Sequence, residues 1–231
     1  MKFENTISFA QHLDVNDELK HFRQKFFIPE KDGKPLIYFC GNSLGLQPKA
    51  VEQFVQEELN DWKNFGVEGH FHAKRPWFSY HHFLTEKTAR LVGAKPIEVV
   101  VMNSLTVNLN LLMLSFFQPM GKRTKIMIEE NPFPSDYYAV EQLLKFYDLN
   151  PNENIIELKP RSVEYTLRTE DILQAIDENK NELALVMFGG VNYYTGQLFN
   201  MKKITEAGHA AGATVGFDLA HAAGNAELFF T

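Results

Sequence analysis

The amino-acid sequence predicts an α/β fold with a mostly parallel sheet flanked by helices. Between residues 97 and 218, short apolar segments alternate with helical patterns. Nearly continuous apolar segments are typical of strands buried on both faces, and their alternation with helices favours parallel strand pairing. No internal repeat or flexible Gly/Ser linker interrupts the pattern.

The part of the sequence before this pattern is less regular. Short helices are expected within residues 5–30, followed by a turn at residues 29–33 and a strand at residues 36–40. A helix should follow Pro48, because apolar residues recur there at helical spacing with acids on the opposite face. Another helix is expected at residues 80–92. The apolar residues after Pro48 are Val51, Phe54, Val55, Leu59 and Trp62.

The alternating part then supplies the strands and helices of the sheet. Ligands of such sheets bind beyond the C-terminal ends of the strands, so the residues that follow each strand are the candidates for chemistry. The expected strands are residues 97–102, 124–128, 154–158, 183–188 and 213–218, and the expected helices are residues 105–117, 135–147, 169–179 and 200–211.

The composition favours a small-molecule ligand. The 231 residues are 45% hydrophobic, enough for one large core or two modest ones, and their net charge is -6. This charge gives no reason to expect a nucleic acid or an anionic membrane as partner, because both need concentrated Lys and Arg. The single cysteine, Cys40, excludes an internal disulfide. A charged N-terminal segment and the lack of a long apolar run predict a cytoplasmic protein.

The segment after the first expected strand, residues 103–106 (NSLT), begins a helix. Ser104 or Thr106 can cap this helix with its hydroxyl group. Alternatively, the free N–H groups and the positive end of the helix form an anion site suited to a phosphate. No Gly-rich loop is present, so neither a Walker A motif nor the fingerprint of an NAD-dependent dehydrogenase applies.

Two prolines restrain an aromatic residue after the second expected strand. Phe133 lies between Pro132 and Pro134 and is followed by Ser135 and Asp136. One interpretation is a well-built helix entry, because proline restricts the backbone and Ser135 or Asp136 can start a helix. The other is that Phe133 stacks on a flat heteroaromatic cofactor beside the anion site.

A carboxylate ends the last expected strand. Asp218 follows an apolar run, and His221 comes three residues later. Burying a carboxylate there is costly unless a positive charge meets it. Pyridoxal phosphate would supply a cationic ring nitrogen for Asp218, a flat ring for Phe133 and a phosphate for the helix start at Thr106. The alternative is that Asp218 only caps the turn that follows it.

Two further features of the sequence bear on a possible site. The glycines of residues 189–196 (GGVNYYTG) predict a tight turn that carries Tyr193 and Tyr194. Four histidines lack a zinc spacing supported by Cys or carboxylates, so no metal site is expected. These histidines are His70, His72, His81 and His82.

Six motifs resemble the kynureninase family. They occur in the family's order from about residue 20 to residue 228, which makes the resemblance specific to this family rather than to a cofactor class. The motifs are YFCGNSLGLQPK (38–49), KRPW (74–77), MNSLTVNLNLLMLSFF (102–117), FPSDYYA (133–139), GVNYYTGQLFN (190–200) and GFDLAHAAGN (216–225).

The resemblance implies a fold-type I, aspartate-aminotransferase-like enzyme that depends on pyridoxal phosphate and forms a homodimer. Such an enzyme hydrolyses the Cβ–Cγ bond of L-kynurenine to give anthranilate and L-alanine. It also acts on 3-hydroxykynurenine, releasing 3-hydroxyanthranilate. The resemblance therefore implies a role in tryptophan catabolism and NAD biosynthesis.

The resemblance also assigns roles to residues. Asp218 matches the partner of the pyridine nitrogen, and His221 matches a neighbouring cofactor contact. Phe133 matches the residue that stacks on the ring, and His70 matches a position near the substrate's aryl group. The full set of implied cofactor contacts is Leu105, Thr106, Phe133, Pro134, Ser135, Asp136, Asp218 and His221.

Some of the family's catalytic groups are expected beyond the residues given. The Schiff-base lysine would follow Thr231, whereas the last lysine here is Lys203. We therefore expect this chain by itself to be an inactive fragment. The alternatives are a non-catalytic, truncated dimerisation partner or another fold-type I enzyme such as a cysteine desulfurase, against which the block GNSLGLQP (41–48) argues.

The expected domain organisation follows from the same resemblance. Residues 1–60 would be an N-terminal helical and strand segment that leads into the large domain. Residues 61–231 would be a partial cofactor-binding large domain that is incomplete at its C-terminus, and the small domain would be absent.

Overall fold

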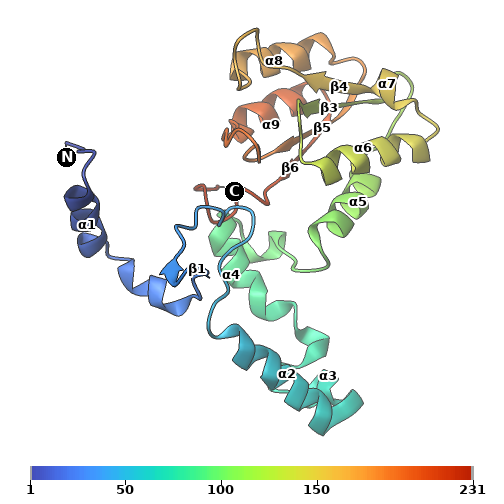
Figure 1. The fold of residues 1–231 in the computed structure, drawn as a ribbon. Coiled ribbons are helices and arrows are strands. Elements are labelled where there is room, and N and C mark those ends of the chain that lie inside the picture. Colours follow the sequence, from blue (N-terminus) through green and yellow to red (C-terminus); the bar gives the residue numbers. More distant parts are fainter. Residues whose placement is uncertain (1, 230–231) are drawn as a thin grey trace. The chain divides into compact units, whose positions relative to one another are not determined.

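A computed structural model describes residues 2–229 (Figure 1). The chain divides between Tyr80 and His81 into two compact units, which are described in turn. The sequence predicted that a cofactor-binding domain begins at residue 61. The division into compact units does not test where such a domain begins, so this boundary stays a prediction. No helix among the described residues is long and apolar enough to cross a membrane.

The first unit consists of short elements. The short helices expected within residues 5–30, the turn after them and the helix after Pro48 are confirmed. The elements are α1 (Ile7–Asn16), β1 (Glu30–Lys31), β2 (Lys34–Pro35), α2 (Val51–Phe65) and α3 (Gly69–His72), with 3-10 turns at Lys20–Lys25, Gly66–Glu68 and Trp77–Ser79.

Residues 36–40 form no strand, so this prediction was wrong. The β1–β2 hairpin ends at Pro35, and the Leu36 N–H then donates to the Pro29 carbonyl at 2.8 Å. The side chains of Ile37 and Phe39 are 83% and 88% exposed. A strand needs a neighbour to pair its backbone groups, and the described part of the first unit places none beside this segment.

Polar contacts fasten the KRPW motif to α2. The Glu58 carboxylate accepts hydrogen bonds from Arg75 Nε at 2.9 Å and from Trp77 Nε1 at 3.0 Å. Asp61 Oδ2 accepts the backbone N–H of Lys74 at 2.9 Å. Gly69 lies against the Trp77 ring, where an added Cβ would be 2.4 Å from a ring carbon. The motif therefore has a structural role within the first unit.

The described part of the second unit contains a four-stranded parallel sheet in the order β4-β3-β5-β6 (Figure 1). The strands expected from residue 124 onward and all four expected helices of this part are confirmed to within about one residue. The strands are β3 (Lys125–Glu129), β4 (Ile155–Leu158), β5 (Leu183–Gly189) and β6 (Thr214–Asp218), and the helices are α4 (His82–Val92), α5 (Leu105–Phe116), α6 (Pro134–Phe146), α7 (Pro151–Asn154), α8 (Thr169–Glu178) and α9 (Met201–Ala210).

The two central strands, β3 and β5, are buried on both faces, as their continuous apolar sequences predicted. On one face, β3 residues Ile126 and Ile128 pack with Leu144 of α6, in a cluster that also includes residues of α5. On the other face, Met127 packs with Ile204 of α9, in a cluster that includes α8. Figure 1 shows α6 and α9 on opposite sides of the strands. The two-residue repeat of strand side chains explains how one strand serves both clusters.

The expected strand at residues 97–102 does not form, which corrects the sequence prediction. A 3-10 turn occupies Pro96–Glu98, and the Glu98 side chain closes it by accepting the Lys95 N–H at 2.8 Å. Ile97 and Val100 are 92% and 60% exposed. The β-branched residues favoured a strand, but proline supplies no N–H for a ladder and the turn is satisfied locally.

Candidate functional site

The candidate site forms where three parallel strands end. The C-terminal ends of β3, β5 and β6 lie at one edge of the sheet, the edge at which ligands bind in such folds. There, the ring centroid of Phe133 lies 5.2 Å from that of Tyr193 and 5.9 Å from that of His221. The structure thus brings together two residues that the sequence singled out as cofactor contacts, along with Tyr193 from the Gly-rich turn.

Two carboxyl groups pair at the same edge. Asp136, in the first turn of α6, is only 6% exposed, and its carboxyl group shares a hydrogen bond with that of Asp218 at the end of β6. Burial and then the nearby charge of Asp218 raise the pKa of Asp136 to about 7. Two carboxyl groups can share such a bond only when one carries a proton. The raised pKa makes Asp136 the partner that carries the proton at pH values below about 7.

Asp218 also caps the turn that follows it. Its Oδ1 accepts the Ala220 N–H at 2.7 Å, and its carbonyl oxygen accepts the Gly190 N–H at 2.7 Å. The turn capping that the sequence offered as an alternative role for Asp218 is therefore observed, and Asp218 also contacts Asp136. These bonds fix the carboxyl group at the end of the strand.

The FPSD segment enters α6 as its prolines suggested. Phe133 is the N-cap residue without a side-chain capping bond, and Pro134 is the first helical residue. The Ser135 hydroxyl donates to Asp136 Oδ1 at 3.2 Å. Proline is favoured at this helix position because its missing N–H has no helical partner to lose. The segment therefore holds Phe133 and Asp136 on one rigid helix start.

The start of α5 carries the two residues implied as phosphate contacts. Leu105 and Thr106 form its first turn, and the N-cap residue Ser104 makes no side-chain capping bond. The structural alternative for this segment was capping by Ser104 or Thr106, and capping by the Ser104 side chain is not observed. The first N–H groups of a helix lack helical partners and carry partial positive charge, which suits an anion. Whether Leu105 and Thr106 contact a phosphate stays a prediction.

Sequence reasoning missed a third acid at this edge, Glu129. It is the last residue of β3 and is 3% exposed, and its Oε1 accepts the Gly189 N–H at 2.9 Å. Burial raises the pKa of the Glu129 carboxyl group, and the charge of Asp218 adds to this effect. The signal that identified Asp218, an acid that ends an apolar strand, was equally present here.

His70 belongs to the first unit. Its Nδ1 lies 2.8 Å from the Val67 carbonyl oxygen, and its ring meets the Trp77 ring edge-on at 5.4 Å. The side chain is exposed within this unit. A role for His70 near a substrate stays a prediction.

The geometry suits a flat aromatic ligand that bears a positive charge. The Asp136–Asp218 pair offers a carboxylate to a cationic N–H, and such a cation would offset the cost of burying a second negative charge. The ring of Phe133 is held by proline on both sides and offers a stacking surface. The site residues of the second unit therefore fit a protonated heteroaromatic ring.

Two solved structures share the fold of this chain. The chain resembles a C-DES mutant with glycine covalently linked to its PLP cofactor, with a TM-score of 0.63 and 12% identity over 92% of this chain and 51% of that one. It also resembles apo cysteine desulfurase from Thermococcus onnurineus, with a TM-score of 0.55 and 17% identity over 80% of this chain and 44% of that one. The fold is therefore the aspartate-aminotransferase-like large-domain fold of PLP fold type I.

Within this class, the chain belongs to the aminotransferase class-V family. The family model matches residues 37–229, which is most of the sequence. The match extends across both compact units.

Curated proteins with high sequence identity to this chain show a more specific resemblance than the family model does. The chain is 56% identical to the kynureninase of Flavobacterium psychrophilum over 228 residues, which are 99% of this chain and 54% of that protein. It is 48% identical to the kynureninase of Homo sapiens over 95% of this chain and 50% of that protein. The resemblance to kynureninases is therefore confirmed. The chain spans about half the length of the curated relatives it matches.

Proposed function

We propose that this chain is part of a pyridoxal-phosphate-dependent kynureninase. The reaction would be hydrolysis of the Cβ–Cγ bond of L-kynurenine or 3-hydroxykynurenine, which yields L-alanine with anthranilate or 3-hydroxyanthranilate. Its place would be tryptophan catabolism and NAD biosynthesis. Support comes from 47–56% identity to curated proteins of that name across nearly all of this chain.

The observation that carries the proposal is the Asp136–Asp218 pair beside the ring of Phe133. When bound, pyridoxal phosphate supplies an electron sink for bonds at the substrate's α-carbon. Asp218 would keep a proton on the ring nitrogen, and Asp136 would share the negative charge of the pair. Phe133 would stack on the ring, and His221, whose ring lies 5.9 Å from Phe133, would border it.

The remaining implied contacts complete the proposed site. The first turn of α5, with Leu105 and Thr106, would bind the phosphate through helix N–H groups. Pro134 and Ser135 would hold the entry of α6 against the cofactor. His70 would orient the aryl group of the substrate.

We further propose a homodimer in the cytoplasm, with neither nucleic acid nor membrane as partner. The apolar face of α2 supports an interface between copies, because the side chains of Leu59 and Trp62 are 49% and 67% exposed. They border a hollow of about 480 Å³ that Val55 and Trp77 also line. Sedimentation of the complete protein would test this assembly.

We also propose that residues 1–231 do not catalyse the reaction by themselves. Fold-type I chemistry needs a lysine that links covalently to the cofactor. The last lysine in the sequence is Lys203, an exposed residue of α9. The 231-residue chain incubated with pyridoxal phosphate should therefore release no anthranilate, and steady release would refute this part.

The main experiment uses the complete protein that contains this chain. It should release fluorescent anthranilate from L-kynurenine when loaded with pyridoxal phosphate. Asp218→Asn should lower kcat by at least about 100-fold, the scale of removing one charge-stabilising group. Glu157→Gln, which makes the same charge change on an exposed position of β4, should leave kcat unchanged.

The same assay separates the alternatives. Release of sulfide from L-cysteine instead of anthranilate from L-kynurenine would identify another fold-type I enzyme. Failure to turn over either substrate, combined with tight binding to an intact subunit, would identify a non-catalytic partner. Full activity of Asp218→Asn would contradict the role given to the carboxyl pair.

A further inference from the structure

Glu129 is a buried acid that the proposed mechanism does not use. Its side chain is 3% exposed at the end of β3. Oε1 accepts the Gly189 N–H at 2.9 Å, whereas Oε2 is buried and has no hydrogen-bond partner among the described residues. A buried carboxylate oxygen without a partner is costly, so the state of this oxygen requires an explanation.

A small polar pocket adjoins Glu129. Its volume is about 40 Å³. A water molecule needs roughly 10–15 Å³ of such space and two to four polar neighbours, so the pocket has room for one or a few. Buried Asn192 contributes one wall, and its Oδ1 already accepts the backbone N–H groups of Tyr194 and Thr195. The lining residues are Glu129, Glu130, Asn131, Pro160, Tyr165, Leu167, Asn192, Tyr194, Thr195, Gln197 and Phe199.

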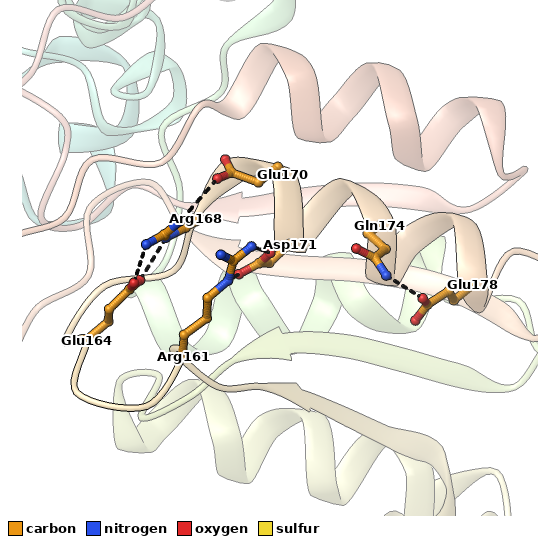
Figure 2. Close-up of polar contacts among 7 residues, drawn as sticks. All are labelled: Arg161, Glu164, Arg168, Glu170, Asp171, Gln174 and Glu178. Carbon is orange, nitrogen blue, oxygen red and sulfur yellow. Dashed lines mark hydrogen bonds and ion pairs between the residues drawn. The ribbon is translucent and has the colours of Figure 1, made fainter.

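The outer wall of this pocket is held by charged contacts. Figure 2 shows the loop before α8, where Arg161 pairs with Asp171 and Arg168 pairs with Glu164. Inside the loop, the Gln197 side chain exchanges two hydrogen bonds with the backbone of Leu167, at 2.9 and 2.6 Å. These contacts keep Tyr165 and Leu167 in place over the pocket.

The charges around Glu129 oppose its ionisation. Burial raises the pKa of Glu129, and the charge of Asp218 on β6 adds to this effect. Glu130, which also lines the pocket, forms an ion pair with Lys159 at 3.9 Å. The other titratable side chains that line the pocket are Tyr165 and Tyr194.

We propose that Glu129 is a positioning residue for the proposed cofactor site: its Oε1 holds the Gly189 N–H at the end of β5, and its buried, unpartnered Oε2 carries a proton rather than a negative charge. This inference rests on the proposed function. Gly189 pairs with Asp218 in the β5–β6 register, and the next residue, Gly190, donates to the Asp218 carbonyl. Glu129 therefore fixes the strand end against which Asp218 is held, without adding a further negative charge beside the Asp136–Asp218 pair.

The test compares two variants with a matched control. Glu129→Gln keeps the shape and stays neutral, Glu129→Leu removes the hydrogen bond to Gly189, and Glu157→Gln changes an exposed acid in the neighbouring strand β4. In the complete protein without cofactor, infrared difference spectra should show that Glu129→Gln removes a protonated carboxylic-acid C=O band that Glu157→Gln leaves intact. This infrared measurement does not depend on catalytic activity.

Unfolding at several pH values gives a second readout. A raised pKa in the folded state means that the native protein loses stability as pH rises above the unfolded-state pKa. Glu129→Gln should therefore gain stability relative to the unmodified protein as pH rises from about 5 to about 8, and Glu157→Gln should show no such trend. Glu129→Leu should bind pyridoxal phosphate about tenfold more weakly than Glu129→Gln, the equivalent of one lost hydrogen bond.

Unchanged infrared spectra in Glu129→Gln, or a flat pH trend, would overturn the proposal that Glu129 is neutral. Equal cofactor affinity of the Leu and Gln variants would overturn the positioning role. Should the complete protein bind no pyridoxal phosphate, the proposed function fails, whereas the infrared and pH results still decide the protonation state of Glu129.

Discussion

Both compact units contain clear apolar patterns, but the two units differ in how far they bury the apolar side chains. In the second unit, Ile128 and Ile204 are 2% and 0% exposed, in the clusters on the two faces of the sheet. In the first unit, Phe54 and Trp62 of α2 are 52% and 67% exposed. A helical pattern therefore predicted the element correctly in both units, but it did not predict whether the apolar face would be covered within the unit.

The difference also concerns the interactions that hold each unit together. The second unit depends on close packing, in which deleting buried methyl groups is costly. The first unit depends on contacts between acids of α2 and the KRPW motif, with Glu57 pairing with Lys74 and Arg75 at 3.0 Å each. Partly exposed ion pairs contribute little and respond to pH and salt. The stability of the two units should therefore respond differently to the loss of buried side chains and to changes in pH.

The largest effect is expected from truncating the core of the second unit. Ile128→Ala removes methyl groups from a side chain that is 2% exposed in β3, and it should lower the free energy of unfolding by about 2–5 kcal/mol. Ile37→Ala makes the same chemical change at a residue that is 83% exposed, and it should cost less than about 0.5 kcal/mol. Urea unfolding of both variants checks the contrast, and equal losses would contradict it.

A smaller effect is expected where the first unit is tightly packed. Gly69→Ala would place a Cβ 2.4 Å from the Trp77 ring, so the ring must move, at a cost of about 1–3 kcal/mol. Gly45→Ala, at a site with nothing within 4 Å, is the matched control. Tryptophan fluorescence should change in the first variant only. An unchanged signal and stability in Gly69→Ala would show that the contact is not tight.

The acids of the two units should give opposite pH dependences. The folded-state pKa of Asp136 is raised from 3.8 to about 7, mainly by burial, so its contribution to stability is largest below pH 3.8 and falls as pH rises through 7. Asp136→Asn should therefore be more stable than the unmodified protein at pH 8 and lose this advantage in acid. Thermal unfolding across pH measures the crossover, and a difference that is constant with pH would contradict the shift.

The smallest effect is expected at Glu57. Hydrogen bonds from Lys74, Gln53 and Arg75 lower its pKa from 4.5 to about 2, so its contribution is present above pH 4.5 and is lost as pH falls toward 2. Glu57→Gln should remove this acid-sensitive contribution, and added salt should weaken it. The side chain is partly exposed, so the change should be modest. A larger loss of stability at pH 8 than for Ile128→Ala would reverse the order proposed for the two units.

The sequence by itself determined the strands and helices from residue 124 to residue 218 and the candidates at the strand ends. These follow from local periodicity, because the face that each residue presents depends on its near neighbours. Phe133, Asp136, Asp218 and His221 were named from sequence, and the parallel strand order brings them to one edge of the sheet.

Only the tertiary structure decided which apolar segments find partners and which acids meet. Residues 36–40 and 97–102 have strand composition but no pairing, because a β-ladder depends on a neighbour distant in sequence. The hydrogen bond between Asp136 and Asp218 and the burial of Glu129 arise in the same way. A carboxyl group's pKa depends on burial and nearby charges, and those come from residues that the chain brings together only when it folds.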